Sequence, residues 1–314
     1  TDVPWELNGL FDLERRPKQP AVAELARAGQ PVLPMLELYS LVVTAGGRLT
    51  APLHVANDGP PLAGVRVEAT LAWEAVEIEV GEVPGRAAAA AGTLELAVPS
   101  TPGAYQVTLR LLAAGEEVAT NSYPVRAVAP PPVDSPEHPS RWSATLPRLA
   151  PGVMVVGEGA LDAEVGERAR ERLAAGGTVV VLAQELEAVA WYPVAVEMAE
   201  VATAWGSTVF HFTCDQRALP SLPERAVLAG EDATVVPTHL LTRVGDRTWP
   251  ETTVVGAFKP VPDPLAGPVV GAVPVGGGRL VTCQYRLAGP AGQGEPAALA
   301  ILGDLLRWAA GGAR

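Results

Sequence analysis

Two cysteines, Cys214 and Cys283, are the side chains of this sequence best suited to act as nucleophiles. A catalytic cysteine sits on a glycine-flanked turn between a strand and a helix, with a histidine to take its proton. Cys214 stands in F-T-C-D-Q without a neighbouring glycine, and Cys283 lies inside the apolar run L-V-T-C-Q-Y. Two cysteines also make no disulfide framework. We expect both thiols to be free and buried, and a cysteine hydrolase or amidotransferase is the alternative.

A pair of acids, Glu185 and Glu187, follows the apolar run from Thr178 to Leu182. If that run is a parallel strand, the two carboxylates lie at the carboxyl edge of a sheet, where open α/β sheets bind their ligands. The pair is therefore a candidate ligand site, active or vestigial. Solvated loop acids are the alternative interpretation.

Three aromatic residues, Trp191, Tyr192 and Trp205, come next along the chain and look exposed. Apolar rings pair well with the CH groups of a sugar face, so these residues are candidate carbohydrate contacts. Core or interface packing explains the same residues.

Signs of a cofactor or metal are weak. Gly157 and Gly159 occupy the place of a dinucleotide-binding loop, but Asp162 replaces the third glycine where a pyrophosphate would approach the helix, which favours a plain tight turn. The four histidines are far apart and form no H-x-H or H-x-x-x-H pair. We expect neither a cofactor nor a metal site.

The elements that would position these side chains form an α/β pattern over residues 151–314. Val153–Val156 predicts a buried strand, Leu161–Ala175 an amphipathic helix and Thr178–Leu182 a second buried strand. Strand, helix and strand in about 30 residues are typical of a parallel βαβ unit. The later pattern predicts strands at Val269–Val273 and Arg279–Gln284 and a helix at Pro296–Ala310, which completes an open α/β domain.

Residues 30–129 alternate apolar and polar side chains between turn signals. The alternation begins at Leu36, Leu38 and Ser40, and Asn57-Asp58-Gly59-Pro60 is a strong turn signal. About seven strands in about 100 residues predict an immunoglobulin-like β-sandwich. Residues 130–150 then carry the proline-rich run APPPVDSPEHPS, which predicts a semi-rigid linker or a proline-rich ligand for another protein.

Residues 1–29 form a proline-broken opening segment. Pro17 ends any helix, and Pro20 begins a short one that runs to Ala28. Val22, Leu25 and Ala26 share one face of that helix, which is too short to be stable alone. We expect this segment either to pack against the sandwich or to be poorly ordered.

Composition excludes some partners. The chain carries 23 basic and 35 acidic residues, a formal net charge of −12. Nucleic acids and anionic membranes require clustered Lys and Arg, so neither is expected as a partner. The apolar runs are shorter than the roughly 18 residues of a membrane helix, and no targeting segment is visible, so we expect a soluble chain.

The two ends of the chain resemble one enzyme family. WELNGLFDLERRPK, over Trp5–Lys18, and GGGRLVTCQYRL followed by EPAALAILGDLLRWA are similar to the C-terminal part of family 2 glycoside hydrolases, the β-galactosidase and β-mannosidase group. The resemblance implies the end of a (β/α)8 barrel at 1–29, then the immunoglobulin-like sandwich, then a class I amidotransferase-like, flavodoxin-like α/β domain.

The resemblance also implies a role. The two catalytic carboxylates of that family, which carry out retaining hydrolysis, lie on earlier barrel strands, so no residue of this chain inherits a catalytic role. A non-catalytic region with a structural, oligomerisation or substrate-entrance role follows, with the catalytic barrel, carbohydrate and further copies of the chain as expected partners. A carbohydrate-binding accessory module is the second hypothesis.

Overall fold

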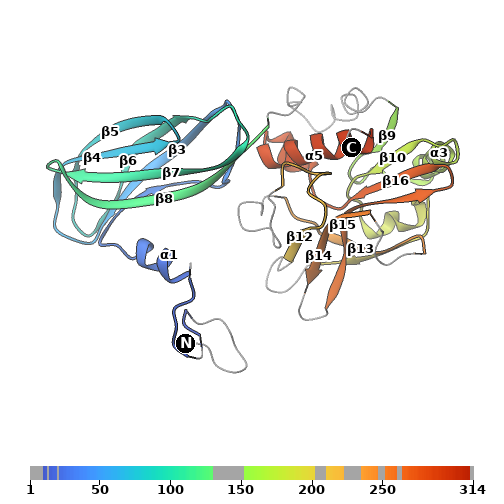
Figure 1. Cartoon of the computed structure of the whole chain (residues 1–314), viewed down its shortest axis with the longest axis horizontal. Helices are drawn as coiled ribbons and strands as arrows, with labels where there is room; N and C mark the ends of the chain where they lie inside the picture. Colours follow the sequence, from blue (N-terminus) through green and yellow to red (C-terminus); the bar gives the residue numbers. More distant parts are fainter. Residues whose placement is uncertain are drawn as a thin grey trace. The chain divides into compact units, whose positions relative to one another are not determined.

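A computed structural model describes residues 10–12, 14–19, 21–129, 152–201, 210–222, 235–246, 252–259 and 264–311. The chain divides into two compact units, Thr1–Ala127 and Val128–Arg314, which are described separately (Figure 1). The predicted linker at 130–150 lies outside the described residues. Within those ranges, no helix is long and apolar enough to cross a lipid bilayer.

The first unit is a sandwich of two sheets built mainly from antiparallel strand pairs (Figure 1). One sheet has the order β1 (Val32–Leu36), β3 (Arg48–Asn57), β6 (Ala87–Ala97). The other has the order β2 (Val42–Thr44), β8 (Glu116–Val128), β7 (Gly103–Ala113), β4 (Leu62–Leu71), β5 (Glu74–Val83). The predicted β-sandwich over 30–129 is therefore present, with eight strands.

Alternation of side chains builds the core of the sandwich. Along β4, Val65, Val67, Ala69 and Leu71 are all fully buried, while the residues between them lie on the outer side. The predicted turn after β3 is also present, because the buried Asn57 amide donates to Pro60 O at 2.8 Å and its Oδ1 accepts from Gly59 N at 2.9 Å. An asparagine at this place holds the turn through its own side chain.

The first predicted strand is wrong beyond Leu36. The alternation of Leu36, Leu38 and Ser40 continues as a sequence pattern, but β1 ends at Leu36 and β2 begins only at Val42. Ser40 explains the break, because its hydroxyl lies 3.2 Å from both N and O of Val42. Such local side-chain bonds compete with the sheet ladder.

The opening segment folds into a small hairpin followed by a helix. Phe11 and Pro17 form an antiparallel bridge, and Arg15, with φ of 62°, makes the turn between them. Asp12 binds the backbone N–H of Arg16 at 2.8 Å and its guanidinium at 2.7 Å. The helix α1 (Ala21–Ala28) has nearly the predicted bounds.

The expectation that α1 packs its apolar face on the sandwich is wrong. No residue of α1 is buried, and Leu25 is 56% exposed. The bonds to the sandwich are polar instead, because Arg27 Nη1 donates to Ser122 O at 2.8 Å and Gln30 Nε2 donates to Thr120 O at 2.9 Å. An amphipathic stripe predicts that a face will be covered, but it does not say by what.

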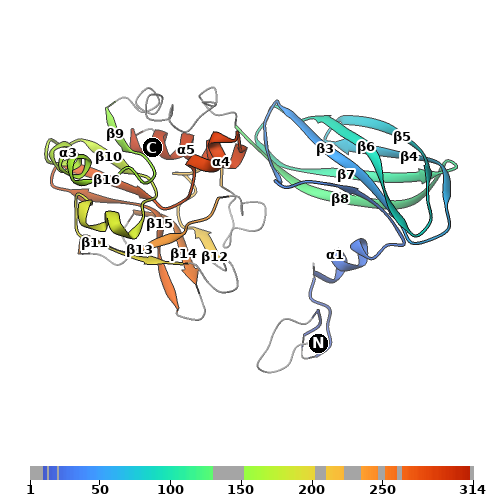
Figure 2. The same ribbon diagram turned by 180° about the vertical axis from the view of Figure 1, so that it is seen from behind.

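The second unit is built on a mixed six-stranded sheet (Figure 2). Its order is β12 (Phe210–Thr213), β14 (Thr252–Lys259), β15 (Leu265–Val275), β16 (Gly278–Cys283), β10 (Thr178–Val181), β9 (Val153–Val156). β9, β10 and β16 are parallel to one another, while β12, β14 and β15 add antiparallel pairs. A separate antiparallel ribbon joins β11 (Val196–Glu200) to β13 (His239–Val244).

Helices cover both faces of the parallel strands. The predicted strand, helix and strand are confirmed, and α3 (Ala163–Ala174) begins at Asp162, whose carboxylate accepts from Val165 N at 2.8 Å. Leu173 of α3 packs in one apolar core with Leu280 of β16. Arg279, the residue directly before Leu280 on β16, faces the opposite side of the sheet. Its guanidinium stacks on Trp308 of α5 (Pro296–Ala309), 4.2 Å from the ring centroid. Of the strands in the antiparallel half of the sheet, the sequence predicted only β15. It did not predict β12 or β14.

Leu109 provides a test of the sandwich core. Its side chain is fully buried in β7, so Leu109→Ala should lower the free energy of unfolding of the first unit by about 2–5 kcal/mol. Val118→Ala on β8, where the side chain is 43% exposed, is the matched control and should change stability by less than about 0.5 kcal/mol. Calorimetry of both variants makes the comparison, and equal losses would contradict the sandwich register.

Candidate functional site

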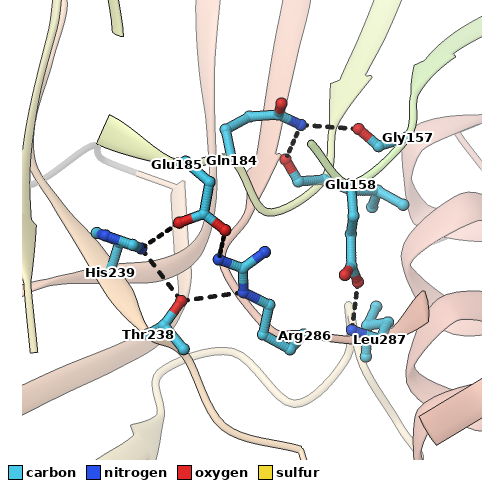
Figure 3. Close-up of polar contacts among 9 residues, drawn as sticks. Gly157, Glu158, Gln184, Glu185, Thr238, His239, Arg286 and Leu287 are labelled. Atoms are coloured by element: carbon cyan, nitrogen blue, oxygen red, sulfur yellow. Dashed lines mark hydrogen bonds and ion pairs between the residues drawn. The ribbon is translucent and has the colours of Figure 1, made fainter. Parts of the chain in front are cut away.

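The carboxyl ends of the three parallel strands bring a group of polar side chains together (Figure 3). Glu158 follows β9, Gln184 and Glu185 follow β10, and Arg286 follows β16. Parallel strands end at the same edge, so residues far apart in sequence become neighbours there. The segment before β13 adds Thr238 to the same place.

Gln184 holds the two strand ends in register. Its side chain is fully buried, and its amide nitrogen donates to Gly157 O and Leu182 O, both at 2.8 Å. Its Oε1 accepts from Leu161 N at 3.0 Å. A buried amide that makes all three bonds fixes the turn after β9 against the end of β10.

Glu158 ties the turn after β9 to the segment after β16. Its carboxylate accepts from the backbone N–H groups of Leu287 and of Ala288, the latter at 2.6 Å, at the start of α4 (Ala288–Gly292). Burial raises the pKa of this carboxyl, and it outweighs the opposing effects of the two backbone N–H groups and of Arg286. Glu158 is thus a structural cap for a short helix.

Glu185, Arg286, Thr238 and His239 form a second network, called here the carboxyl-edge cluster (Figure 3). Arg286 Nη2 donates to Glu185 Oε1, and its Nε donates to Thr238 Oγ1 at 2.9 Å. Thr238 Oγ1 lies 3.1 Å from His239 Nδ1, and Glu185 Oε2 lies 3.7 Å from the same nitrogen.

Arg286 links the cluster, because it donates to both Glu185 and Thr238. The direction of the bond between Thr238 Oγ1 and His239 Nδ1 depends on the tautomer of the imidazole, because a threonine hydroxyl can both donate and accept.

The structure separates the two acids that the sequence paired. Glu185 belongs to the carboxyl-edge cluster, and its side chain is 53% exposed. Glu187 lies on the 3₁₀ helix η2 (Leu186–Trp191), is exposed, and makes no hydrogen bond or ion pair to any described residue. The sequence pairs Glu185 with Glu187 because both stand in a predicted loop after one strand. In the structure, Glu187 lies on η2 and does not join the cluster.

The three aromatic candidates differ in exposure. Trp191 ends η2 and is 41% exposed. Tyr192, which looked exposed in the sequence, is 3% exposed, and its hydroxyl accepts from Gln284 Nε2 at 3.3 Å. Burial raises the pKa of Tyr192 and leaves no ring face for a sugar. Trp205 lies outside the described residues.

The two thiols are free but lie in different environments. Cys283 is fully buried at the end of β16, and burial raises its pKa to about 12. The expectation that both are buried is wrong for Cys214, which is exposed because β12 ends at Thr213 before it. Partial burial still raises the pKa of Cys214. Neither thiol has the lowered pKa of an activated nucleophile.

Sequence reasoning missed most of the polar residues at this edge: Glu158, Gln184, Thr238, His239 and Arg286. Arg286 could have been found from the sequence, because it follows a predicted strand just as Glu185 does. Thr238 and His239 could not, since the strands β11 and β13 that position them were not predicted. Among the described residues, no group of three His, Cys, Asp or Glu is arranged to hold a metal ion.

A buried histidine outside the cluster also escaped the sequence analysis. His211 on β12 is 5% exposed, and its Nδ1 lies 2.8 Å from the hydroxyl of Tyr285. Burial lowers the pKa of His211 to about 4. The folded protein therefore holds this imidazole neutral at neutral pH.

The thiol environments predict selective labelling. Iodoacetamide should alkylate Cys214 in the folded chain, more slowly than a free peptide thiol, because its pKa is raised. Cys283 should react only after unfolding. Mass spectrometry of Cys214→Ser, which should show no labelling in the folded state, provides the control. Rapid alkylation of Cys283 in the native protein would contradict its burial.

The buried His211 predicts a pH dependence of stability. Its folded pKa is about 4 and its unfolded pKa about 6.5, so below pH 6.5 the unfolded state binds the extra proton and stability falls until about pH 4. Between pH 7 and pH 5 the loss should be about 2 kcal/mol. His211→Gln should remove this part of the pH dependence of the second unit in calorimetry.

A matched substitution controls for acid effects elsewhere in the chain. His54→Gln, at the surface of the first unit, should leave the pH dependence of the second unit unchanged. An unchanged pH profile in His211→Gln would contradict the burial of a neutral imidazole.

Comparison with known proteins finds solved structures that resemble part of the chain, but it assigns no family. No family model matches the sequence, and no curated protein matches it. Among solved structures, red sea bream transglutaminase is 19% identical over 31% of this chain and 14% of its own, with a TM-score of 0.26. Two structures of a CARDB domain from Pyrococcus furiosus are 12% and 14% identical over 31% of this chain and 94% and 85% of their own, with TM-scores of 0.25 and 0.24, and the second is a complex with two metal ions. These likenesses are too low to assign a family.

Proposed function

We propose that this chain is the non-catalytic C-terminal region of a glycoside hydrolase acting on β-linked sugars. The observation that carries the proposal is the apolar surface of the opening segment, formed by Leu10, Phe11 and Leu25, which are 37%, 37% and 56% exposed. These three side chains are called here the N-terminal apolar patch. Leu10 and Phe11 belong to the stretch Trp5–Lys18 that resembles the end of the family 2 barrel, and Leu25 lies on the helix α1 that follows it.

The local fold of that stretch supports docking against another domain. Part of its charge is neutralised locally, because Arg16 pairs with Asp12 at 2.7 Å and with Glu14 at 2.9 Å. Its large apolar side chains are not covered by the sandwich. Large exposed apolar side chains on a short opening segment are consistent with an interface to another domain. The catalytic barrel is the proposed partner.

The state of the titratable groups supports a non-catalytic role for the second unit. Glu158 caps a helix, and Glu185 is bound to Arg286. Both thiols have raised pKa values. We propose that this unit is an amidotransferase-like, flavodoxin-like domain, and its parallel strands β9, β10 and β16 with helices on their two faces support this. Its role would be to support the barrel, to assemble copies of the chain or to shape the substrate entrance.

The proposal predicts that the chain alone does not hydrolyse aryl β-glycosides. Incubation with 4-nitrophenyl β-D-galactoside and β-D-mannoside should release nitrophenol no faster than buffer does. Turnover that Glu185→Gln or Cys214→Ser abolishes would contradict the non-catalytic assignment.

Substitutions in the N-terminal apolar patch test whether this segment offers a docking surface to another domain. Phe11→Ser with Leu25→Ser should reduce the binding of an apolar fluorescent dye to the chain, without lowering the melting temperature of the sandwich. Val118→Ser, whose side chain is 43% exposed on the sandwich, is the control and should leave dye binding unchanged. Equal dye binding in all three proteins would show that the patch is not an accessible apolar surface.

A further inference from the structure

We propose that Asp58, in the turn between β3 and β4, is a latent site of isoaspartate formation that Asn57 holds unreactive in the folded chain. The turn Asn57-Asp58-Gly59-Pro60 belongs to the first unit. The inference therefore rests neither on the carboxyl-edge cluster nor on the proposed function.

An aspartate that is followed by glycine rearranges without an enzyme. The backbone nitrogen of the glycine attacks Cγ of the aspartate and forms a C–N bond, while a hydroxyl of the protonated carboxyl and the N–H proton leave as water. The product is a five-membered succinimide ring. Water from the solvent then opens the ring, and when it adds to the former main-chain carbonyl carbon the chain continues through Cγ as isoaspartate. Glycine favours the attack because it has no Cβ beside the reacting nitrogen.

Asp58 meets two requirements of this reaction. It is exposed, and its carboxylate makes no hydrogen bond or ion pair with any described residue, so the side chain is able to turn toward the main chain. Gly59 follows it directly, and this is the only Asp-Gly pair in the sequence.

The third requirement, a free attacking nitrogen, is blocked by Asn57. Gly59 N donates to Asn57 Oδ1 at 2.9 Å, so this hydrogen bond must break before the nitrogen loses its proton and reaches Cγ of Asp58. The acceptor is itself fixed, because the Asn57 side chain is 1% exposed and its amide nitrogen donates to Pro60 O at 2.8 Å and to Pro84 O at 3.2 Å. A buried amide with all of these bonds made is costly to move.

The neighbouring backbone also restrains the turn. Asp58 N donates to Pro31 O at 2.8 Å, on the amino side of the peptide bond that would rearrange. On the other side, a Cβ at Gly85 would lie 2.6 Å from Gly59 O, so the chain after β5 packs directly on the turn. The folded chain therefore restrains rotation about the Asp58–Gly59 peptide.

Asn57 is not the reactive residue itself. Ring closure at Asn57 would use the backbone nitrogen of Asp58, which is bonded to Pro31 O. It would also expel the Asn57 amide nitrogen, which holds Pro60 and Pro84. Exposure and a glycine neighbour assign the reaction to Asp58 and the protecting role to Asn57.

The test is incubation of the whole chain at neutral pH and physiological temperature, folded in buffer and unfolded in guanidinium chloride. Peptide mapping with fragmentation then measures isoaspartate at position 58 and separates it from any signal at the Asn8-Gly9 pair, which lies outside the described residues. Isoaspartate should form at least about tenfold more slowly in the folded chain, because several hydrogen bonds must break there. Asp58→Glu, which cannot close a five-membered ring, is the control and should give no signal at this position.

Two substitutions isolate the hydrogen bond to Gly59. Asn57→Ala removes the acceptor and should raise the rate in the folded chain by about three- to tenfold, the factor expected for the loss of one hydrogen bond. Asn57→Ser loses the two donated bonds but keeps a hydroxyl that accepts from the N–H two residues on, so its rate should lie between those of Asn57→Ala and the unsubstituted chain. The melting temperature of each variant shows that the sandwich is folded during the incubation.

Two results would overturn the proposal. One is isoaspartate at position 58 forming as fast in the folded chain as in guanidinium chloride. The other is a folded Asn57→Ala or Asn57→Ser chain that reacts as slowly as the unsubstituted one, because the turn would then be protected without the Asn57 side chain. Should Asn57→Ala fail to fold, the comparison between Asn57→Ser and the unsubstituted chain decides the question.

Discussion

The parallel pairing of β10 with β9 on one side and β16 on the other is the constraint on which the second unit depends. Parallel strands must be joined by crossovers, so the chain after each strand returns over a face of the sheet. All three strands therefore end at one edge, and Glu158, Glu185 and Arg286 meet there although they come from distant parts of the sequence. The cluster depends on the fold, because no single local sequence motif contains its residues.

Close backbone approaches pack α3 against its neighbours in the second unit. A Cβ at Gly166 of α3 would lie 2.1 Å from Trp191 O, so only glycine lets η2 pack directly on the helix. A Cβ at Gly278 would lie 2.5 Å from Gly177 O and 2.6 Å from Leu173 O, where β16 starts beside β10. These two glycines let α3 approach η2 and the start of β16 closely.

The elements with strong periodicity were predictable from the sequence, and those set by tertiary contacts were not. The local sequence pattern determines the strand that contains Val65 and Val67 and the helix that begins after Asp162. Both elements were therefore predicted correctly. Leu38 continued the same alternation but lies outside any strand, because Ser40 bonds to the backbone of Val42. Glu185 was predictable as a strand-end acid. Its partners Thr238 and His239 were not, since only the three-dimensional pairing of β13 with β11 places them.

The central claim is that the ends of β9, β10 and β16 meet in one polar cluster. A crystal structure of the chain tests it most directly. The account predicts an ion pair between Arg286 and Glu185 and a bond from Arg286 Nε to Thr238 Oγ1. A strand edge at which Arg286 does not meet Glu185 would contradict it.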